Sequence, residues 1–385
     1  MKFKTSKGIL IAFGELFLKS ENVKKIFKRK LNQNIVFYLR RKKLDFRFYQ
    51  LRERIFIEST QINKVKRVVR HIFGIAWFAE SLFFKDINLK KLSEYISENY
   101  RNWIKKDESF ALRLVKGDFK VKREKIIEEI AKNINRKVNL SNPKREIFIE
   151  KRKENLFLYF KKINGMGGLP SGVSGKVLTL VSGGIDSPVA AFLLAKRGTE
   201  QVWLHFHSFP LVSRRSIEKT KELSRIFLNY QPRLKIYLVP FSPAQFRIKT
   251  KIPAKYRILI YRRIMLKIAQ DVARKEKCLA LVTGESLGQV SSQTLPNIKI
   301  IEEGIKMPVF RPLIGMDKEE IITLARKIKT FSISIKPQED CCILFVPKHS
   351  SAKGKIEKIR ELEAKLEFKE IIREAEKKAE VLYLK

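Results

Sequence analysis

Residue types suited to phosphate chemistry are concentrated in one segment, Val177-Leu-Thr-Leu-Val-Ser-Gly-Gly-Ile-Asp-Ser-Pro188. Gly183 and Gly184 have no Cβ, so the backbone can turn sharply there and its N–H groups can approach a phosphate closely. Ser182 and Ser187 add hydroxyl donors, and Pro188 suits the first turn of a helix. Such a helix directs the positive end of its dipole at an anion held by the turn. The segment therefore predicts an anion-binding turn between a strand and a helix.

The turn lacks the Gly-Lys-Ser/Thr ending of a Walker-type loop. The run Ser182-Gly-Gly-Ile-Asp-Ser187 resembles instead the pyrophosphatase (PP) loop, Ser-Gly-Gly-x-Asp-Ser, of enzymes that split ATP into AMP and pyrophosphate by adenylating a substrate. Asp186 is a candidate ligand of Mg²⁺, which prefers oxygen ligands and keeps several waters. Its alternative role is to cap the helix that follows.

Strand-like and helix-like patterns alternate around and after this loop. Strands are expected at 177–181, 202–206, 235–239 and 279–283, and helices at about 189–197, 213–229, 254–277 and 318–329. This alternation predicts an α/β domain with a doubly wound parallel sheet, whose ligands bind at the carboxyl ends of the strands. The lysine-rich tail from Ser351 onward is expected to be helical.

The chain before the loop predicts two smaller α+β domains, at residues 1–60 and 61–165. Expected strands lie at 8–13, 44–50, 54–58, 109–115, 146–151 and 156–161, and expected helices at 23–39, 63–73 and 123–135. The glycine-rich, charge-free stretch 164–175 reads as a linker by composition. We place the linker at 166–176 and the PP-loop domain at 177–385.

The charge of the chain is strongly unbalanced, with 82 basic against 40 acidic residues and a formal net charge of +42. Such a charge predicts a polyanionic partner, bound with the salt dependence of counterion release; the alternative is a general compositional bias toward lysine. Candidate RNA contacts surround Phe119, namely Arg113, Lys116, Lys120, Lys122 and Arg123. A folded RNA would be read there mainly by its shape. A solvated basic surface is the alternative.

The apolar runs, the N-terminus and the cysteine content of the sequence predict a cytoplasmic protein. No uninterrupted apolar run approaches the roughly 20 residues that a membrane span needs, and no secretory signal is read at the N-terminus. The chain has three cysteines, two of them adjacent, which cannot build a disulfide framework.

Two of these cysteines are candidates for sulfur chemistry. Cys278 precedes an apolar run and is expected to be a buried structural thiol, whereas Cys341 and Cys342 stand in the segment Pro337-Gln-Glu-Asp-Cys-Cys-Ile-Leu344. A reactive thiol needs positive surroundings that lower its pKa, and Glu339 and Asp340 do not supply them. A metal site, or an iron–sulfur cluster shared between subunits, remains an alternative use of the adjacent pair.

Five blocks in a fixed order carry a family resemblance: Val181-Ser-Gly-Gly-Ile-Asp-Ser-Pro188, His205-Phe-His207, Leu281-Val-Thr-Gly-Glu-Ser-Leu-Gly-Gln-Val-Ser-Ser-Gln-Thr294, Arg311-Pro-Leu-Ile-Gly-Met-Asp-Lys318 and Glu339-Asp-Cys-Cys342. Together they resemble the ThiI family of tRNA uracil 4-sulfurtransferases, which make 4-thiouridine at position 8 of tRNA. The resemblance implies that residues 1–60 are ferredoxin-like and that residues 61–165 form a THUMP RNA-binding domain. It does not include the rhodanese-like extension of some members.

The same resemblance implies roles for particular residues. Adenosine would be contacted by Leu180, Val181, His205, Phe206, Arg262, Gly284 and Gln293. Ser182, Gly183, Gly184 and Ser187 would hold the pyrophosphate, while Lys318 would neutralise charge on the α-phosphate. Cys341 would handle sulfur, with Cys342 as the partner that resolves a persulfide.

The implied partners are ATP, Mg²⁺, tRNA and a cysteine desulfurase as sulfur donor. Sulfur transfer to a carrier protein of thiamine biosynthesis and a homodimeric state are left open. Two other function classes compete with this one: another PP-loop adenylating enzyme, and a tRNA-binding protein with an inert nucleotide fold. The intact PP loop argues against the inert fold, and the cysteine pair argues against an enzyme that needs no sulfur carrier.

Overall fold

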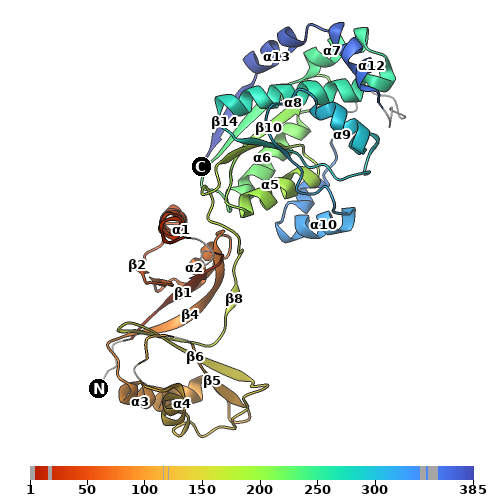
Figure 1. Cartoon of the computed structure of the whole chain (residues 1–385). Coiled ribbons are helices and arrows are strands. Elements are labelled where there is room, and N and C mark those ends of the chain that lie inside the picture. The colour runs from red at the N-terminus through yellow and green to blue at the C-terminus, as the bar shows by residue number, and fades with distance from the viewer. Residues whose placement is uncertain (1–4, 16–19, 116, 120, 339–343, 346–353) are drawn as a thin grey trace. The chain divides into compact units, whose positions relative to one another are not determined.

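The computed structural model describes residues 5–15, 20–115, 117–119, 121–338, 344–345 and 354–385. The chain divides into two compact units, Met1–Leu169 and Pro170–Lys385 (Figure 1). The first unit contains the two N-terminal parts expected from the sequence, and the second contains the PP-loop segment.

The first unit is built on eight strands: β1 (Thr5–Phe13), β2 (Arg47–Gln50), β3 (Ile55–Glu58), β4 (Ile75–Lys85), β5 (Phe110–Leu114), β6 (Arg145–Arg152), β7 (Asn155–Tyr159) and β8 (Ile163–Asn164). Its helices are α1 (Glu21–Arg41), α2 (Ile62–Val69), α3 (Leu89–Asn99), the 3₁₀ helix η2 (Tyr100–Asn102) and α4 (Arg123–Ala131). The strands form one sheet in the order β2-β3-β1-β4-β7-β6-β5, with β8 paired to β4. β5 and β6 run parallel to each other.

Alternation along the strands gives this sheet separate apolar clusters. Ile9 and Ile11 of β1 pack with residues of α1 and α2, whereas Leu10 between them packs with Phe56 and Phe157. A further core lies under α3 and α4. Residues on both sides of the boundary proposed at residue 60 share the α1–α2 core, because β1 pairs with β4 as well as with β3.

The sequence predicted most elements of this unit within a few residues but assigned neither β4 nor α3. β4 connects the two halves of the sheet, because it pairs with β1 on one side and with β7 on the other. Its apolar residues are divided between two cores, with Phe78 in the α1–α2 core and Phe84 in the α3–α4 core. That division reflects tertiary pairing, which a local pattern does not reveal.

The second unit contains the strands β9 (Lys176–Leu180), β10 (Glu200–His207), β11 (Leu234–Pro240), β12 (Ala280–Val282), β13 (Val309–Phe310) and β14 (Glu380–Leu384). Its helices are α5 (Asp186–Lys196), α6 (Arg215–Phe227), α7 (Ser242–Lys251), η3 (Ala254–Tyr256), α8 (Arg257–Lys275), η4 (Ser291–Gln293), α9 (Leu295–Glu302), α10 (Lys318–Lys327), α11 (Phe331–Ser334), α12 (Ile356–Ala364) and α13 (Phe368–Lys377). The sheet order is β13-β12-β9-β10-β11-β14.

This sheet confirms the predicted α/β class. Its first five strands run parallel, and helices cover both faces, with α8 on one side and α5 and α6 on the other (Figure 1). The order in which strands are added to the sheet reverses at β9: β10 and β11 lie on one side of β9, and β12 lies on the other. Ligands of doubly wound sheets bind at such a switch point, beyond the carboxyl ends of the strands.

The C-terminal tail departs from the prediction at its end. It is helical over α12 and α13 as expected, but its last strand, β14, pairs antiparallel with β11 at the edge of the sheet. The unit also contains α7 and α9, which the sequence did not predict.

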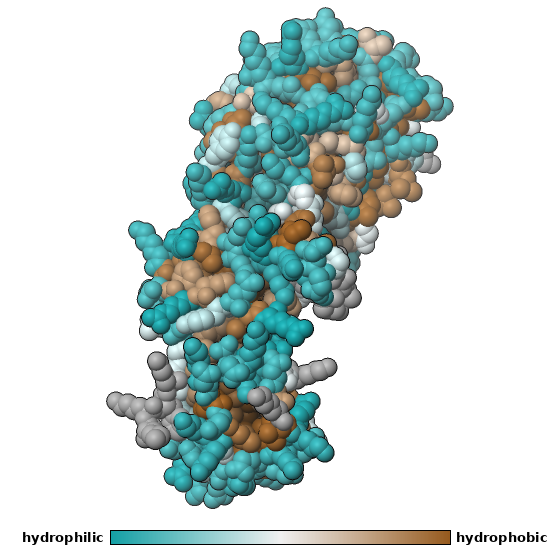
Figure 2. Space-filling view, turned by 60° about the vertical axis from the view of Figure 1, so that its left-hand side comes forward, coloured by the Kyte–Doolittle hydropathy of each residue, from teal (hydrophilic) through white to brown (hydrophobic). Residues whose placement is uncertain are grey.

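No helix in the described part of the chain is long and apolar enough to cross a membrane. The face drawn in Figure 2 is covered mainly by hydrophilic residues in both units.

Candidate nucleotide-binding site

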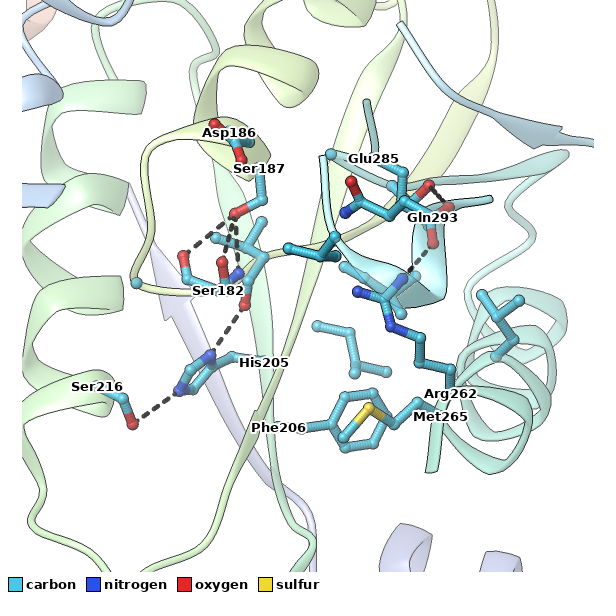
Figure 3. A pocket seen from close by; sticks show the side chains of 18 of the residues that line it. Ser182, Asp186, Ser187, His205, Phe206, Ser216, Arg262, Met265, Glu285 and Gln293 are labelled. Carbon is cyan, nitrogen blue, oxygen red and sulfur yellow. Dashed lines mark hydrogen bonds and ion pairs between the residues drawn. The ribbon is translucent and has the colours of Figure 1, made fainter. Parts of the chain in front are cut away.

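The PP loop lies between β9 and α5, at the carboxyl end of the strand that marks the switch point. The two serine hydroxyls hold its shape (Figure 3). Ser182 N donates to Ser187 Oγ over 2.9 Å, and Gly184 N donates to Ser182 Oγ over 3.3 Å. Ser187 is buried. Both serines thus build the loop itself, in addition to the ligand role expected for them.

Asp186 opens α5 and its carboxylate joins the loop to two distant segments. Lys318 Nζ donates to Oδ1 over 2.6 Å, and Gln289 Nε2 donates to Oδ2 over 3.0 Å. Both contacts are to side chains of other elements and neither is to a backbone amide of α5. Lys318 is the first residue of α10, where Asp317 and Glu320 form a capping box. The geometry therefore favours a site role for Asp186 over helix capping.

A close approach of two backbones fixes the position of the loop. A Cβ built on Gly284, just after β12, would lie 2.7 Å from Ser187 N and 2.8 Å from Ser187 Cα. Any side chain at residue 284 would therefore push the start of α5 away from β12. The glycine predicted from the sequence is needed here for space.

A buried charge cluster forms the wall opposite the loop. Glu285 accepts hydrogen bonds from Arg262 Nη1, from Arg311 Nε over 2.6 Å and from Thr283 Oγ1 over 2.9 Å. Burial alone would raise the pKa of Glu285, but the guanidinium groups of Arg262 and Arg311 outweigh it and hold that pKa below its ordinary value. Glu285 therefore stays ionised and keeps Arg262 oriented (Figure 3).

His205 and Phe206 form a third wall at the end of β10. His205 Nδ1 lies 2.9 Å from Val181 O, and Nε2 lies 3.3 Å from Ser216 Oγ. Because a carbonyl only accepts, Nδ1 carries a proton. Phe206 belongs to the apolar core and also lines the cavity beside Met265 (Figure 3).

These walls enclose a cavity of about 320 Å³, within the range of small-molecule sites. The predicted nucleotide-site residues that line it are Leu180, Val181, Ser182, Gly183, Asp186, Ser187, His205, Phe206, Arg262, Gly284 and Gln293. Gly184 is adjacent to the lining in the loop, and Lys318 reaches the site through Asp186. The structure thus brings these residues to one cavity, and their nucleotide-binding roles stay a prediction.

Three buried polar atoms around the cavity find no hydrogen-bond partner among the described residues: Arg262 Nε, Gln293 Oε1 and Gln338 Oε1. Buried polar groups in native proteins are nearly always paired, so these three atoms are candidate partners of a ligand or an ordered water. Glu285, Gln289 and Gln338 were not predicted as site residues. Glu285 and Gln289 lie in the segment 281–294 together with the predicted Gly284 and Gln293, and this shared segment was the available signal.

The five basic residues predicted to contact RNA differ in their surroundings. Arg113 Nε donates to Glu146 Oε1 over 2.8 Å, and Arg123 donates to Leu114 O. Lys122 is exposed, and Lys116 and Lys120 lie outside the described residues. Phe119 packs against the α3–α4 core, so this aromatic serves packing. An RNA role for the five basic residues stays a prediction.

Of the three cysteines, the structure describes only Cys278. Cys278 is a buried thiol, as predicted, and burial raises its pKa to about 12. Cys341 and Cys342 lie outside the described residues. No group of three or more metal-ligating side chains gathers within the described part of the chain.

Neutralising Glu285 should destabilise the second unit. Glu285→Gln removes the buried carboxylate that pairs with Arg262 and Arg311, and among the described residues only Arg311 keeps another acidic partner, Glu302. Breaking a buried pair in this way typically costs about 3 kcal/mol or more. Because the folded pKa is lowered, the contribution of Glu285 is present above its ordinary pKa and is lost as pH falls through the lowered value. Urea unfolding at pH 7 and at acid pH should show a gap between wild type and variant that narrows on acidification. Glu361→Gln, at an exposed pair with Lys358, is the control and should leave the gap near zero at both pH values.

Comparison with known proteins gives consistent matches. The family model described as "Thiamine biosynthesis protein (ThiI)" matches residues 172–368, and "ThiI ferredoxin-like domain" matches residues 8–79. A "Probable tRNA sulfurtransferase" of Thermoanaerobacter sp. is 40% identical over 373 residues, covering 94% of this chain and 96% of that protein. One of Thermus thermophilus is 49% identical over 245 residues, covering 64% and 60%.

Solved structures agree with these relatives. The crystal structure of a 4-thiouridine synthetase–RNA complex with bound ATP superposes with a TM-score of 0.88 at 29% identity, covering 99% of this chain and 100% of that one. The structure of PH1313 from Pyrococcus horikoshii shares the fold, with a TM-score of 0.64 at 20% identity over 84% of this chain and 99% of that one.

Proposed function

This chain belongs to the ThiI family of tRNA sulfurtransferases, and from that premise we propose that it uses ATP to convert uridine 8 of tRNA to 4-thiouridine. The observation that carries the proposal is the cavity itself. A PP loop, the half-buried Arg262 and unpaired polar atoms converge on one space at the switch point of the sheet. The relative solved with RNA and bound ATP supports ATP as the ligand of this space.

Adenylation is the first step of the proposed reaction. Uracil O4 attacks the α-phosphorus of ATP, the bond from that phosphorus to the bridging oxygen breaks, and pyrophosphate leaves with this oxygen, while the N3 proton of uracil is released to solvent. The backbone N–H groups at Gly183 and Gly184 would stabilise this leaving group, as preorganised donors do in oxyanion sites at ~3–4 kcal/mol each. Lys318, held beside the loop by Asp186, would offset charge developing on the α-phosphate.

Mg²⁺ fits the acidic group at this position. The Asp186 carboxylate is partly exposed at the loop and already binds cationic and amide donors, so it can exchange them for a cation that keeps most of its waters. When bound, Mg²⁺ would neutralise the phosphate oxygens.

Sulfur transfer is the second step. A cysteine desulfurase would charge Cys341 as a persulfide, whose terminal sulfur attacks C4 of the adenylated uracil and expels AMP. Cys342 would then attack Cys341 Sγ, so that the sulfur–sulfur bond to the substrate breaks and a Cys341–Cys342 disulfide forms. A neighbouring-residue disulfide is a strained ring that an external thiol can readily reduce, which would restore both thiols.

The first unit should supply tRNA binding. Its basic composition and its own apolar cores predict that residues 1–169, expressed alone, bind tRNA with an affinity that falls steeply as salt rises. Filter binding at low and high salt measures this, with residues 170–385 as the matched fragment. Affinity that does not change with salt, or binding confined to residues 170–385, would contradict the assignment.

We extend the proposal to sulfur transfer from the same cysteine to a carrier protein of thiamine biosynthesis, which the description of the matching family model favours. Restoration of thiazole synthesis in a strain lacking its own family member would test it. A homodimeric state stays open.

A further inference from the structure

Gln338 lies against the PP loop although it comes from a distant part of the chain. It lines the nucleotide cavity, and a Cβ built on Gly183 would lie 2.0 Å from Gln338 Oε1 and 3.1 Å from Nε2. The amide therefore occupies the space that the missing side chain of Gly183 leaves. Its Oε1 atom is buried and accepts no hydrogen bond from the residues that the structure describes.

The backbone that carries Gln338 is fixed by a buried lysine. Lys219 of α6 is 3% exposed, and its Nζ donates to Ser334 O over 2.8 Å and to Lys336 O over 2.7 Å. These carbonyls stand four and two residues before Gln338. This anchor fixes the backbone that leads to Gln338, so its side chain starts from a defined place beside the PP loop.

We propose that the Gln338 side-chain amide is a phosphate-binding group of the ATP site, donating from Nε2 to the phosphates beyond the α-phosphate. The proposal rests on the proposed use of ATP at this loop. Phosphate oxygens only accept hydrogen bonds, so an amide beside them must present its Nε2. Rotation about the last side-chain bond exchanges Oε1 and Nε2 without moving the anchored backbone.

A phosphate cannot pair with Oε1, because both only accept hydrogen bonds, so the amide would turn Nε2 toward it. A methyl group at Gly183 would meet the end of the Gln338 side chain, which would then have to move away from the loop.

The test compares ATP with AMP, which lacks the phosphates that Gln338 would contact. Calorimetric titration of the full chain with each nucleotide is carried out for wild type, Gln338→Ala and Gln338→Glu. We expect Gln338→Ala to weaken ATP binding about tenfold, the effect of one hydrogen bond to a charged group. Gln338→Glu should weaken it further, because a carboxylate would face the phosphates. AMP binding should be unchanged in both.

Lys336→Ala is the matched control, since it removes an exposed side chain paired with Glu222 and keeps the carbonyl that Lys219 holds. It should bind ATP as wild type does. Unchanged or tighter ATP binding by Gln338→Ala would overturn the proposal, and so would equal weakening of ATP and AMP, which indicates a structural role. Failure of the wild type to bind ATP would instead overturn the proposed function, and this assignment with it.

Discussion

Replacing Cys341 with serine should abolish sulfur transfer to tRNA while ATP cleavage continues. The hydroxyl cannot carry a persulfide, so the adenylated uracil forms but finds no sulfur nucleophile. We expect 4-thiouridine formation to fall by on the order of a thousandfold or more, as when a catalytic nucleophile is removed. Near-ultraviolet absorbance of purified tRNA reports the product, and release of pyrophosphate reports adenylation.

The two other cysteines are the matched controls for this variant. Cys342→Ser should keep at least partial activity under strong reductant, because an external thiol can replace the resolving thiol. Cys278→Ser should keep full activity, since Cys278 is buried and its pKa is raised to about 12. Full activity in Cys341→Ser would contradict the assignment and transfer the role to Cys342 or to external sulfide.

Asp186→Ala should leave tRNA binding nearly intact but remove pyrophosphate release. The carboxylate holds Lys318 at the loop and is the group suited to Mg²⁺, so its loss should cost about a hundredfold or more in adenylation. ATP–pyrophosphate exchange measures the chemistry, and a filter-binding curve measures tRNA affinity. Asp186→Asn, which keeps the shape and removes the charge, should be nearly as impaired.

Asp271→Ala is a control at a partly exposed carboxylate of α8, paired with Arg274, and should exchange pyrophosphate as wild type does. If exchange persists at the wild-type rate in Asp186→Ala, the carboxylate serves only the local structure of the loop.

The phosphate-binding part of the site could be predicted from the sequence because its residues are contiguous. Ser182, Gly183, Gly184 and Ser187 sit on one turn, so their spacing alone specifies the geometry. The residues from other elements, such as Arg262 and Gln293, were identified through family resemblance and not from local pattern. Their convergence on one cavity follows from the parallel sheet, whose strand ends meet at one edge.

Contacts that depend on tertiary packing could not be predicted. Nothing local to Gln338 or Lys219 indicates that one touches Gly183 and the other anchors that segment. The basic residues predicted as RNA contacts surround Phe119, and this aromatic packs against the α3–α4 core. Charge and aromaticity along a sequence do not show which side of an element faces the core.

The most direct test of the account is reconstitution of the reaction on tRNA. Purified full-length protein is incubated with ATP, Mg²⁺, tRNA and a cysteine desulfurase with cysteine, and the modified position is mapped by nuclease digestion and mass spectrometry. The account predicts one 4-thiouridine at position 8, about one AMP per sulfur transferred, and no product when uridine 8 is replaced by cytidine. Sulfur at another position, or thiolation at the same rate without ATP, would contradict it.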